Sequence, residues 1–165
     1  MDNIENYLQI LIESLNKKDI LLDRLLEKNR VQQECVKGKE YESVDWDAFN
    51  LLVSEKEVII DNIIEIDNGF DDVYERIRDE VIGNREKYIE QVRKLQELIT
   101  RLTDKGAQIQ VGEERNRQII DNIFSKTRQQ IRTQRTTINA ASSYYRTMSN
   151  SVVRAAEDSI LDTKK

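Results

Sequence analysis

Residues 44–66, VDWDAFNLLVSEKEVIIDNIIEI, decide the fold, because they combine a helix start with a long apolar stripe. Asp45 is a good N-cap, and Asp47 in the first turn suits the positive end of the helix dipole. Val44 before the cap and Phe49 after it have the spacing of a hydrophobic staple. Steps of three and four residues then join Phe49, Leu52, Lys56, Ile59, Ile63 and Ile66. This spacing predicts a long amphipathic helix with one lysine in its apolar stripe.

The N-terminal segment has the same kind of pattern. Asp2 and Glu5 have the spacing of a reciprocal N-terminal cap. An apolar stripe follows at Ile4, Leu8, Leu11, Leu15, Leu22, Leu25 and Val36, and its remaining positions hold Lys18, Asn29 and Gln32. This stripe predicts a helix of about 35 residues that ends near Gly38.

Glycines provide the few candidate interruptions in the rest of the chain. Asn68-Gly69 predicts a break in the second helix, and Gly106 with Gly112 predicts a turn near 104–113. Each interior glycine costs a helix about 1 kcal/mol relative to alanine. However, the apolar register runs unbroken from Phe70 to Met148, and this argues against the turn near 104–113.

The composition allows only a few long elements. The 165 residues include 5 Gly and no Pro, too few to punctuate many short strands and turns. We therefore predict an all-α fold, an elongated antiparallel bundle of three to four long coiled-coil-like helices with a loosely packed C-terminal segment. The expected bundle covers residues 1–138. Serine and asparagine dilute the stripe in residues 139–165, which we expect to be a partly helical or flexible tail.

The side chains that enzymes and metal sites need are scarce. The chain has no histidine and a single cysteine, Cys35, which excludes His-based catalytic triads, His-containing zinc sites and thiolate clusters. Neighbouring carboxylates such as Asp71 and Asp72 are expected on solvated helix faces. No cleft desolvates them there, as general acid–base catalysis would require. We predict a protein that is not an enzyme and that uses no cofactor and no metal.

The charge is uneven along the chain. Residues 1–38 hold 6 basic and 7 acidic groups, residues 39–100 hold 8 and 17, and residues 101–165 hold 12 and 7. The simplest interpretation is an unevenly decorated solvated surface, and the alternative is a basic C-terminal third that meets an acidic surface. Nucleic-acid binding is disfavoured, because the pI is about 5.0 and Phe124 is the lone aromatic residue among the cations of 115–135.

The sequence predicts a cytoplasmic location. Acidic residues surround the short apolar run Ile10-Leu11-Ile12, unlike a signal peptide. No run approaches the ~18 apolar residues of a membrane span, and the unpaired Cys35 suits a reducing compartment.

Three passages together resemble one protein family. They are LIESLNKKDILLDRLLEKNRVQQECV (11–36), FNLLVSEKEVIIDNIIEIDNGFDDVYERIRDE (49–80) and AASSYYRTM (140–148). The chain resembles the FlgN-type flagellar export chaperones. The resemblance implies a cytosolic helical bundle for type III secretion that binds the C-terminal helices of hook-associated proteins (FlgK- and FlgL-like). Such a chaperone prevents premature assembly of the cargo and delivers it to the export apparatus.

A partner helix would be held by the apolar face of a fourth helix and the start of the tail. The candidate partner-binding residues are Ile119, Ile120, Ile123, Phe124, Thr127, Ile131, Ile138, Tyr144, Tyr145 and Met148. Part of this face is expected to belong to the bundle core. Tyr144, Tyr145 and Met148 are the preferred partner contacts, since adaptable aromatic and methionine side chains suit reversible binding.

Two other interpretations stay open at this stage. A structural or adaptor coiled-coil protein would dimerise through the same stripes. The other is the related chaperone that escorts the filament-cap protein, which would share the same bundle and the use of a C-terminal helix.

Overall fold

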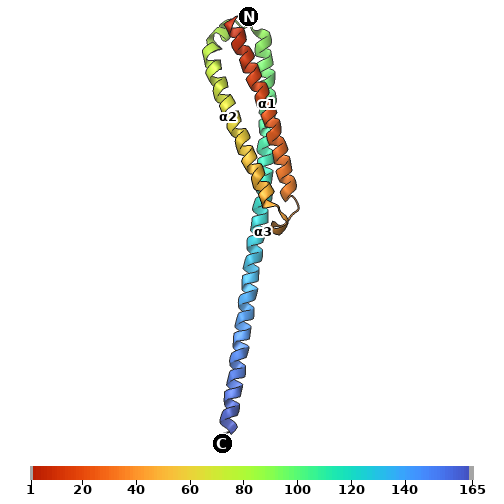
Figure 1. Cartoon of the computed structure of the whole chain (residues 1–165), viewed down its shortest axis with the longest axis vertical. Helices are drawn as coiled ribbons and strands as arrows, with labels where there is room; N and C mark the ends of the chain where they lie inside the picture. Colours follow the sequence, from red (N-terminus) through yellow and green to blue (C-terminus); the bar gives the residue numbers. More distant parts are fainter. Residues whose placement is uncertain (1, 164–165) are drawn as a thin grey trace. The chain divides into compact units, whose positions relative to one another are not determined.

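The computed structural model describes the backbone of residues 2–163 and the side chains of residues 2–144, 146 and 147. Its elements are α1 (Asn3–Val36), the short 3-10 helix η1 (Tyr41–Ser43), α2 (Trp46–Gly83) and α3 (Ile89–Thr163) (Figure 1). Residues 2–163 contain no strand. The predicted all-α class is confirmed, with three long helices packed together.

The chain divides into two units, residues 1–121 and 122–165. The first unit contains α1, α2 and the beginning of α3. Within it, contact partners in α2 move backwards along the sequence as α1 advances, from Lys18–Asp67 to Lys28–Glu55. Partners in α3 move forwards, from Asp19–Lys105 to Asn29–Asn116. α2 therefore runs antiparallel to α1, whereas α1 and the beginning of α3 are parallel (Figure 1).

The predicted caps define the starts of α1 and α2. Asp2 Oδ1 accepts a hydrogen bond of 2.8 Å from the Glu5 amide, and the Glu5 carboxylate accepts one of 3.3 Å from the Asp2 amide. Asp45 Oδ1 accepts from the Ala48 amide at 3.0 Å. α1 ends at Val36, and Gly38 follows with φ of 70°, a conformation that glycine adopts without strain. These boundaries follow from local side-chain chemistry, as the sequence predicts.

The predicted break at Asn68-Gly69 is wrong, because α2 continues through it to Gly83. A single glycine costs about 1 kcal/mol, whereas Phe70 and Val73 beyond it both pack against the core. The burial of these two side chains outweighs that cost. The true end of α2 is closed by Asn84, whose side-chain amide donates to the Glu80 carbonyl at 2.8 Å.

The turn predicted near 104–113 is also wrong, because α3 is continuous across it. Leu102 and Ile109 keep their positions in the core on either side of Gly106. The second glycine, Gly112, lies where a Cβ would be 3.3 Å from Asn29 Nδ2. Gly112 thus serves close packing of α3 beside α1 rather than a turn, and the unbroken apolar register was the better guide.

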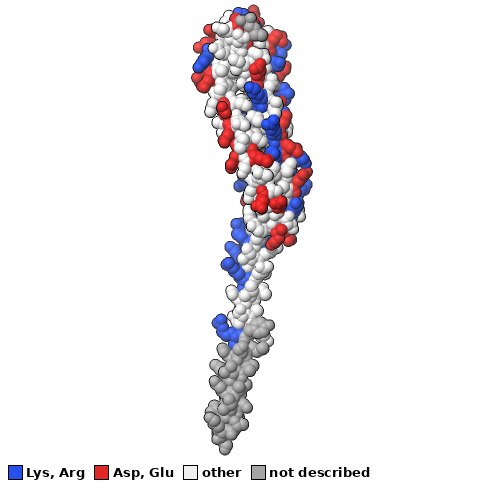
Figure 2. Space-filling view, viewed as in Figure 1, with Lys and Arg blue, Asp and Glu red and all other residues white. Residues whose placement is uncertain are grey.

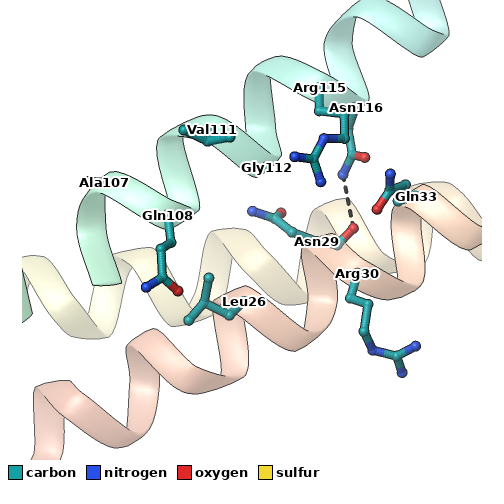
Figure 3. A pocket seen from close by; sticks show the side chains of 10 residues that line it. All are labelled: Leu26, Asn29, Arg30, Gln33, Ala107, Gln108, Val111, Gly112, Arg115 and Asn116. Carbon is teal, nitrogen blue, oxygen red and sulfur yellow. Dashed lines mark hydrogen bonds between the residues drawn. The ribbon is translucent and has the colours of Figure 1, made fainter. Parts of the chain in front are cut away.

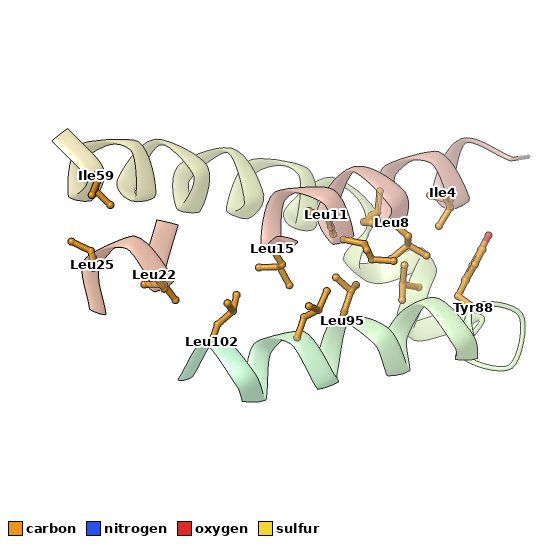
Figure 4. Packing of buried hydrophobic residues seen from close by; sticks show 14 residues of the cluster. Ile4, Leu8, Leu11, Leu15, Leu22, Leu25, Ile59, Tyr88, Leu95 and Leu102 are labelled. Carbon is orange, nitrogen blue, oxygen red and sulfur yellow. The ribbon is translucent and has the colours of Figure 1, made fainter. Parts of the chain in front are cut away.

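The core of the first unit draws on all three helices (Figure 4). Its buried members are Ile4, Leu8, Leu11, Ile12, Leu15, Leu22, Leu25, Ile59, Ile77, Val81, Tyr88, Leu95, Leu98 and Leu102. Full burial of one such side chain contributes about 1.5–3 kcal/mol. Leu8 and Leu11 of α1 and Ile77 of α2 are almost completely shielded from solvent.

Candidate functional site

A buried polar layer interrupts the apolar core in the half of the bundle that holds the end of α1. Lys56 of α2 is 7% exposed, and its Nζ lies 2.8 Å from Gln32 Oε1 of α1 and 2.5 Å from Glu113 Oε1 of α3. Gln32 is 2% exposed. Residues of α1 and α3 thus contact the ammonium group of Lys56 in α2. These contacts offset the desolvation cost of burying its charge.

Two asparagines extend this layer between α1 and α3 (Figure 3). Asn116 Nδ2 donates to the Asn29 carbonyl at 3.0 Å, and Asn29 Nδ2 donates to the Ile109 carbonyl at 3.5 Å. The Asn29 Oδ1 atom is buried and has no hydrogen-bond partner among the described residues. Asn29 is therefore held by a short and a long contact while one of its polar atoms stays unsatisfied.

Grooves lie on both sides of the polar layer. One, between α1 and α3, has a volume of about 480 Å³ and is lined in part by Leu26, Asn29, Gln33, Gln108, Gly112 and Arg115 (Figure 3). The other, between α2 and α3, has a volume of about 660 Å³ and is lined in part by Phe49, Val53, Lys56, Ile109, Glu113 and Ile120. Both grooves are lined by apolar and polar side chains.

The predicted partner-binding residues lie in α3, so the separate fourth helix that was expected to hold them does not form. Ile119 and Ile120 belong to the first unit and are half-buried, and Ile120 lines the groove beside Lys56. Ile119 and Ile120 therefore have packing roles in the first unit. Ile123 belongs to the second unit and is buried.

The remaining predicted residues lie in the second unit. The exposed fractions are 39% for Phe124, 44% for Ile131, 63% for Ile138 and 65% for Tyr144. Thr127 is half-buried, and its hydroxyl donates to the Ile123 carbonyl at 3.0 Å. The side chains of Tyr145 and Met148 lie outside the described residues. Where it is described, the face is helical and displays large apolar side chains to solvent.

The balance of acidic and basic residues differs between α2 and the described part of the second unit (Figure 2). α2 holds 11 Asp and Glu residues against 3 Lys and Arg, whereas residues 122–147 hold 5 Lys and Arg and no Asp or Glu. In the first unit, several cations pair with a carboxylate of another helix, such as Lys105 with Asp19 at 2.6 Å. Residues 122–147 are thus a basic helical segment with exposed apolar side chains.

The shifted pKa values belong to structural ion pairs. Lys87 lies 2.7 Å from Asp2 Oδ2 and lowers the pKa of that carboxyl well below its usual range, with further help from the Glu5 amide. The same carboxylate raises the pKa of Lys87. Burial, together with the hydrogen bond to Asp2, raises the pKa of Tyr88. This cluster ties the start of α1 to the start of α3.

Two further findings concern kinds of site. No group of three or more His, Cys, Asp or Glu residues in the described part of the chain is arranged to hold a metal ion. Among residues 2–163, no helix is both long enough and apolar enough to span a membrane.

Comparison with models of known protein families, with curated protein sequences and with solved structures finds no match for this chain.

The polar layer is a feature that the sequence indicated without revealing its purpose. Asn29, Gln32, Lys56, Glu113 and Asn116 all stand at polar positions inside apolar stripes. Their pairing depends on how the three helices align, which spacing within one helix does not determine. A search for polar positions at matching heights, with α2 antiparallel and α3 parallel to α1, would have brought these five together.

Proposed function

We propose that this protein is a cytoplasmic flagellar export chaperone of the FlgN type. In this proposal it binds the amphipathic C-terminal helices of the hook-associated proteins, which form the hook–filament junction and are called junction proteins below. It prevents their premature assembly and delivers them to the type III export apparatus. The proposal rests on the sequence resemblance and on one structural observation. Ile131 and Ile138, which lie on a helical segment, are 44% and 63% exposed.

The physical basis is the burial of apolar area. An unassembled junction protein presents an amphipathic helix that would otherwise self-associate, and a helix with a matching stripe shields it from water. Full burial of an isoleucine contributes about 1.5–3 kcal/mol, so a few such contacts give reversible binding after the cost of association is subtracted. Binding of this kind needs no nucleotide, metal or covalent step.

The structure divides the predicted contacts into two groups. Ile119, Ile120 and Ile123 are already partly or fully buried in the free chain. Phe124, Ile131, Ile138 and Tyr144 are exposed and are the residues we assign to cargo, with Tyr145 and Met148 retained as predictions from the sequence. Thr127 remains a candidate at the margin of the same face.

The test is a binding measurement with the junction proteins of the source organism. We expect each full-length junction protein to bind the purified chain in titration calorimetry. The variant Ile131→Ser/Ile138→Ser and the variant Tyr144→Ala/Tyr145→Ala should each weaken binding by tenfold or more, while the helix content measured by circular dichroism stays unchanged.

A matched control uses exposed isoleucines of the first unit. Ile10 and Ile20 are 46% and 55% exposed, so Ile10→Ser/Ile20→Ser removes similar side chains from α1. This control should leave cargo affinity unchanged. Absence of binding to every junction protein would refute the proposal, and an equal effect of the control would place the binding face elsewhere.

A second candidate function, a structural or adaptor coiled coil, is favoured by a different observation. Leu51 and Val58 of α2 are seven residues apart and both are 61% exposed. Seven-residue spacing of apolar side chains suits pairing with another helix. Light scattering distinguishes the two functions: a stable dimer without cargo, lost in Leu51→Ser/Val58→Ser, favours the adaptor.

A further inference from the structure

The exposed apolar side chains of residues 122–147 recur at seven-residue spacing. Phe124, Ile131 and Ile138 occupy one position of the repeat, and Thr127, Gln134 and Ala141 stand three residues after them. In a heptad these are the first and fourth positions, which form the seam between paired helices. The segment is helical, and the three large side chains are exposed. This seam is narrow, with one large apolar residue per two turns.

The cations of this segment have a defined place relative to the seam. Counting Phe124 as the first position, Arg128 and Arg135 fall at the fifth position of successive repeats and flank the seam on one side. The other flank holds the neutral Gln130 and Thr137. Lys126 and Arg132 lie farther around the helix. All four cations are exposed, and none forms an ion pair within the described residues.

We propose that residues 122–147 select an acidic amphipathic helix, whose carboxylates recur at seven-residue spacing beside Arg128 and Arg135. The inference rests on the proposed function and names the class of cargo helix that this surface takes. Charges that flank a helix seam set the choice of partner, because opposite charges attract across it and like charges repel. A segment with five cations and no anion favours a partner of the opposite sign.

The apolar seam favours a helix over the other polyanions that a basic segment attracts. Phosphate neutralisation needs only cations, and it gives exposed Ile131 and Ile138 no role. No aromatic residue lies between 125 and 143 to stack on bases. Helices that lie in a membrane interface present a wide apolar face, whereas Gln134 interrupts the seam here. A peptide helix uses both the seam and its charged flank.

The test compares two synthetic helical peptides with the full-length chain. Both peptides have leucine at the first and fourth heptad positions; one has glutamate at both flanking positions, and the other has lysine there. We expect the glutamate peptide to bind about tenfold more tightly in titration calorimetry at low ionic strength. The preference should nearly vanish in 1 M salt, where the Debye length is about 3 Å.

Matched variants separate flank-specific pairing from general attraction. Arg128→Gln/Arg135→Gln should lose most of the preference for the glutamate peptide. Lys126→Gln/Arg132→Gln removes the same charge away from the seam and should keep most of it. Equal losses in the two double variants would overturn the inference, because the preference would then reflect net charge alone.

A second test compares binding of the glutamate peptide with binding of other polyanions. The double variant Ile131→Ser/Ile138→Ser should lose binding of the glutamate peptide by at least tenfold. A 20-base-pair DNA duplex and phosphatidylserine vesicles should bind the wild type more weakly than the peptide does. Tighter binding of either one, unaffected by the serine variant, would overturn the inference.

The result is distinguishable from the test of the proposed function. If junction proteins bind with no dependence on salt or on Arg128 and Arg135, the chaperone function stands and the acidic-helix inference fails. If no junction protein binds but the glutamate peptide does, the charge preference of the seam stands and the assignment to flagellar cargo fails.

Discussion

Lys56 Nζ of α2 lies 2.5 Å from Glu113 Oε1 of α3, deep enough that the lysine side chain is 9% exposed while the glutamate remains 44% exposed. Gln32 Oε1 of α1 accepts a hydrogen bond from the same ammonium group at 2.8 Å. The ammonium is buried and the carboxylate reaches solvent, so the pair bears less of a desolvation cost than a fully buried pair does. This arrangement fixes the relative heights of the three helices.

We predict that Lys56→Met lowers the free energy of unfolding by about 2 kcal/mol, because the buried Gln32 amide oxygen loses its donor. Urea denaturation measures this loss. Lys28→Met is the matched control, since Lys28 pairs with Glu55 near the surface of the same two helices. It should cost less than about 1 kcal/mol. Equal losses in the two variants would show that burial of Lys56 does not decide its contribution.

The two glycines of α3 should respond differently to alanine. A Cβ at Gly106 meets nothing within 4 Å, so Gly106→Ala should raise the free energy of unfolding by about 1 kcal/mol. At Gly112 the Cβ would be 3.3 Å from Asn29 Nδ2, and the crowding should cancel much of that gain. Thermal denaturation of both variants checks the contrast. A larger gain at Gly112 would contradict the close approach of α1 and α3.

The ion pair at the start of α1 predicts a pH dependence. The pKa of Asp2 is lower in the folded chain, so its stabilisation is complete above the ordinary carboxyl value near ~4 and is lost as the pH falls further. The pKa of Lys87 is raised, so its part is complete below the ordinary value near ~10.4 and is lost as the pH rises through the higher folded value.

Asp2→Asn keeps an effective N-cap and removes the charge. Its melting temperature should therefore fall below that of the wild type between about pH 5 and 9, and the difference should shrink toward pH 3. Asp47→Asn removes a first-turn carboxylate of α2 that makes no ion pair among the described residues, and is the control. A difference that persists unchanged at pH 3 would exclude the ion pair as its cause.

The orphaned Asn29 Oδ1 predicts a stabilising substitution. Burial of a carbonyl oxygen without a donor costs about 1–3 kcal/mol. Asn29→Leu removes it and leaves the backbone carbonyl that accepts from Asn116 in place. We expect unfolding to require about 1 kcal/mol more. Asn116→Leu, which removes a satisfied donor, should instead destabilise the fold, and the opposite order would contradict the hydrogen-bond assignment.

The sequence predicted the features that depend on one helix at a time. The caps at Asp2 and Asp45, the apolar stripe of α1 and the all-α class all follow from local spacing and are confirmed. The errors concern glycine. A cost of about 1 kcal/mol predicts a break only when packing on both sides is weak, and residues such as Phe70 and Leu102 are held by other helices.

The real break between α2 and α3 went unrecognised because the apolar register passes through Val81 and Tyr88 without a gap. The polar layer was hidden for a related reason. Lys56 and Glu113 are 57 positions apart, and only the observed directions of the helices bring them to one height. The exposure of Ile131 and Ile138 likewise does not follow from spacing within one helix.

The parallel arrangement of α1 and the beginning of α3 has a consequence for the order of folding. Partners such as Asp19 and Lys105 are 86 positions apart, whereas α1 and α2 meet across the short connection that contains η1. Closing the shorter loop costs less chain entropy. The connection between α2 and α3, residues 84–88, is also short, but α1 and α2 are synthesised first. An α1–α2 hairpin should therefore assemble while the polypeptide is still being synthesised, with α3 docking last. In native-state hydrogen exchange, amides at the beginning of α3 should open before those of α1.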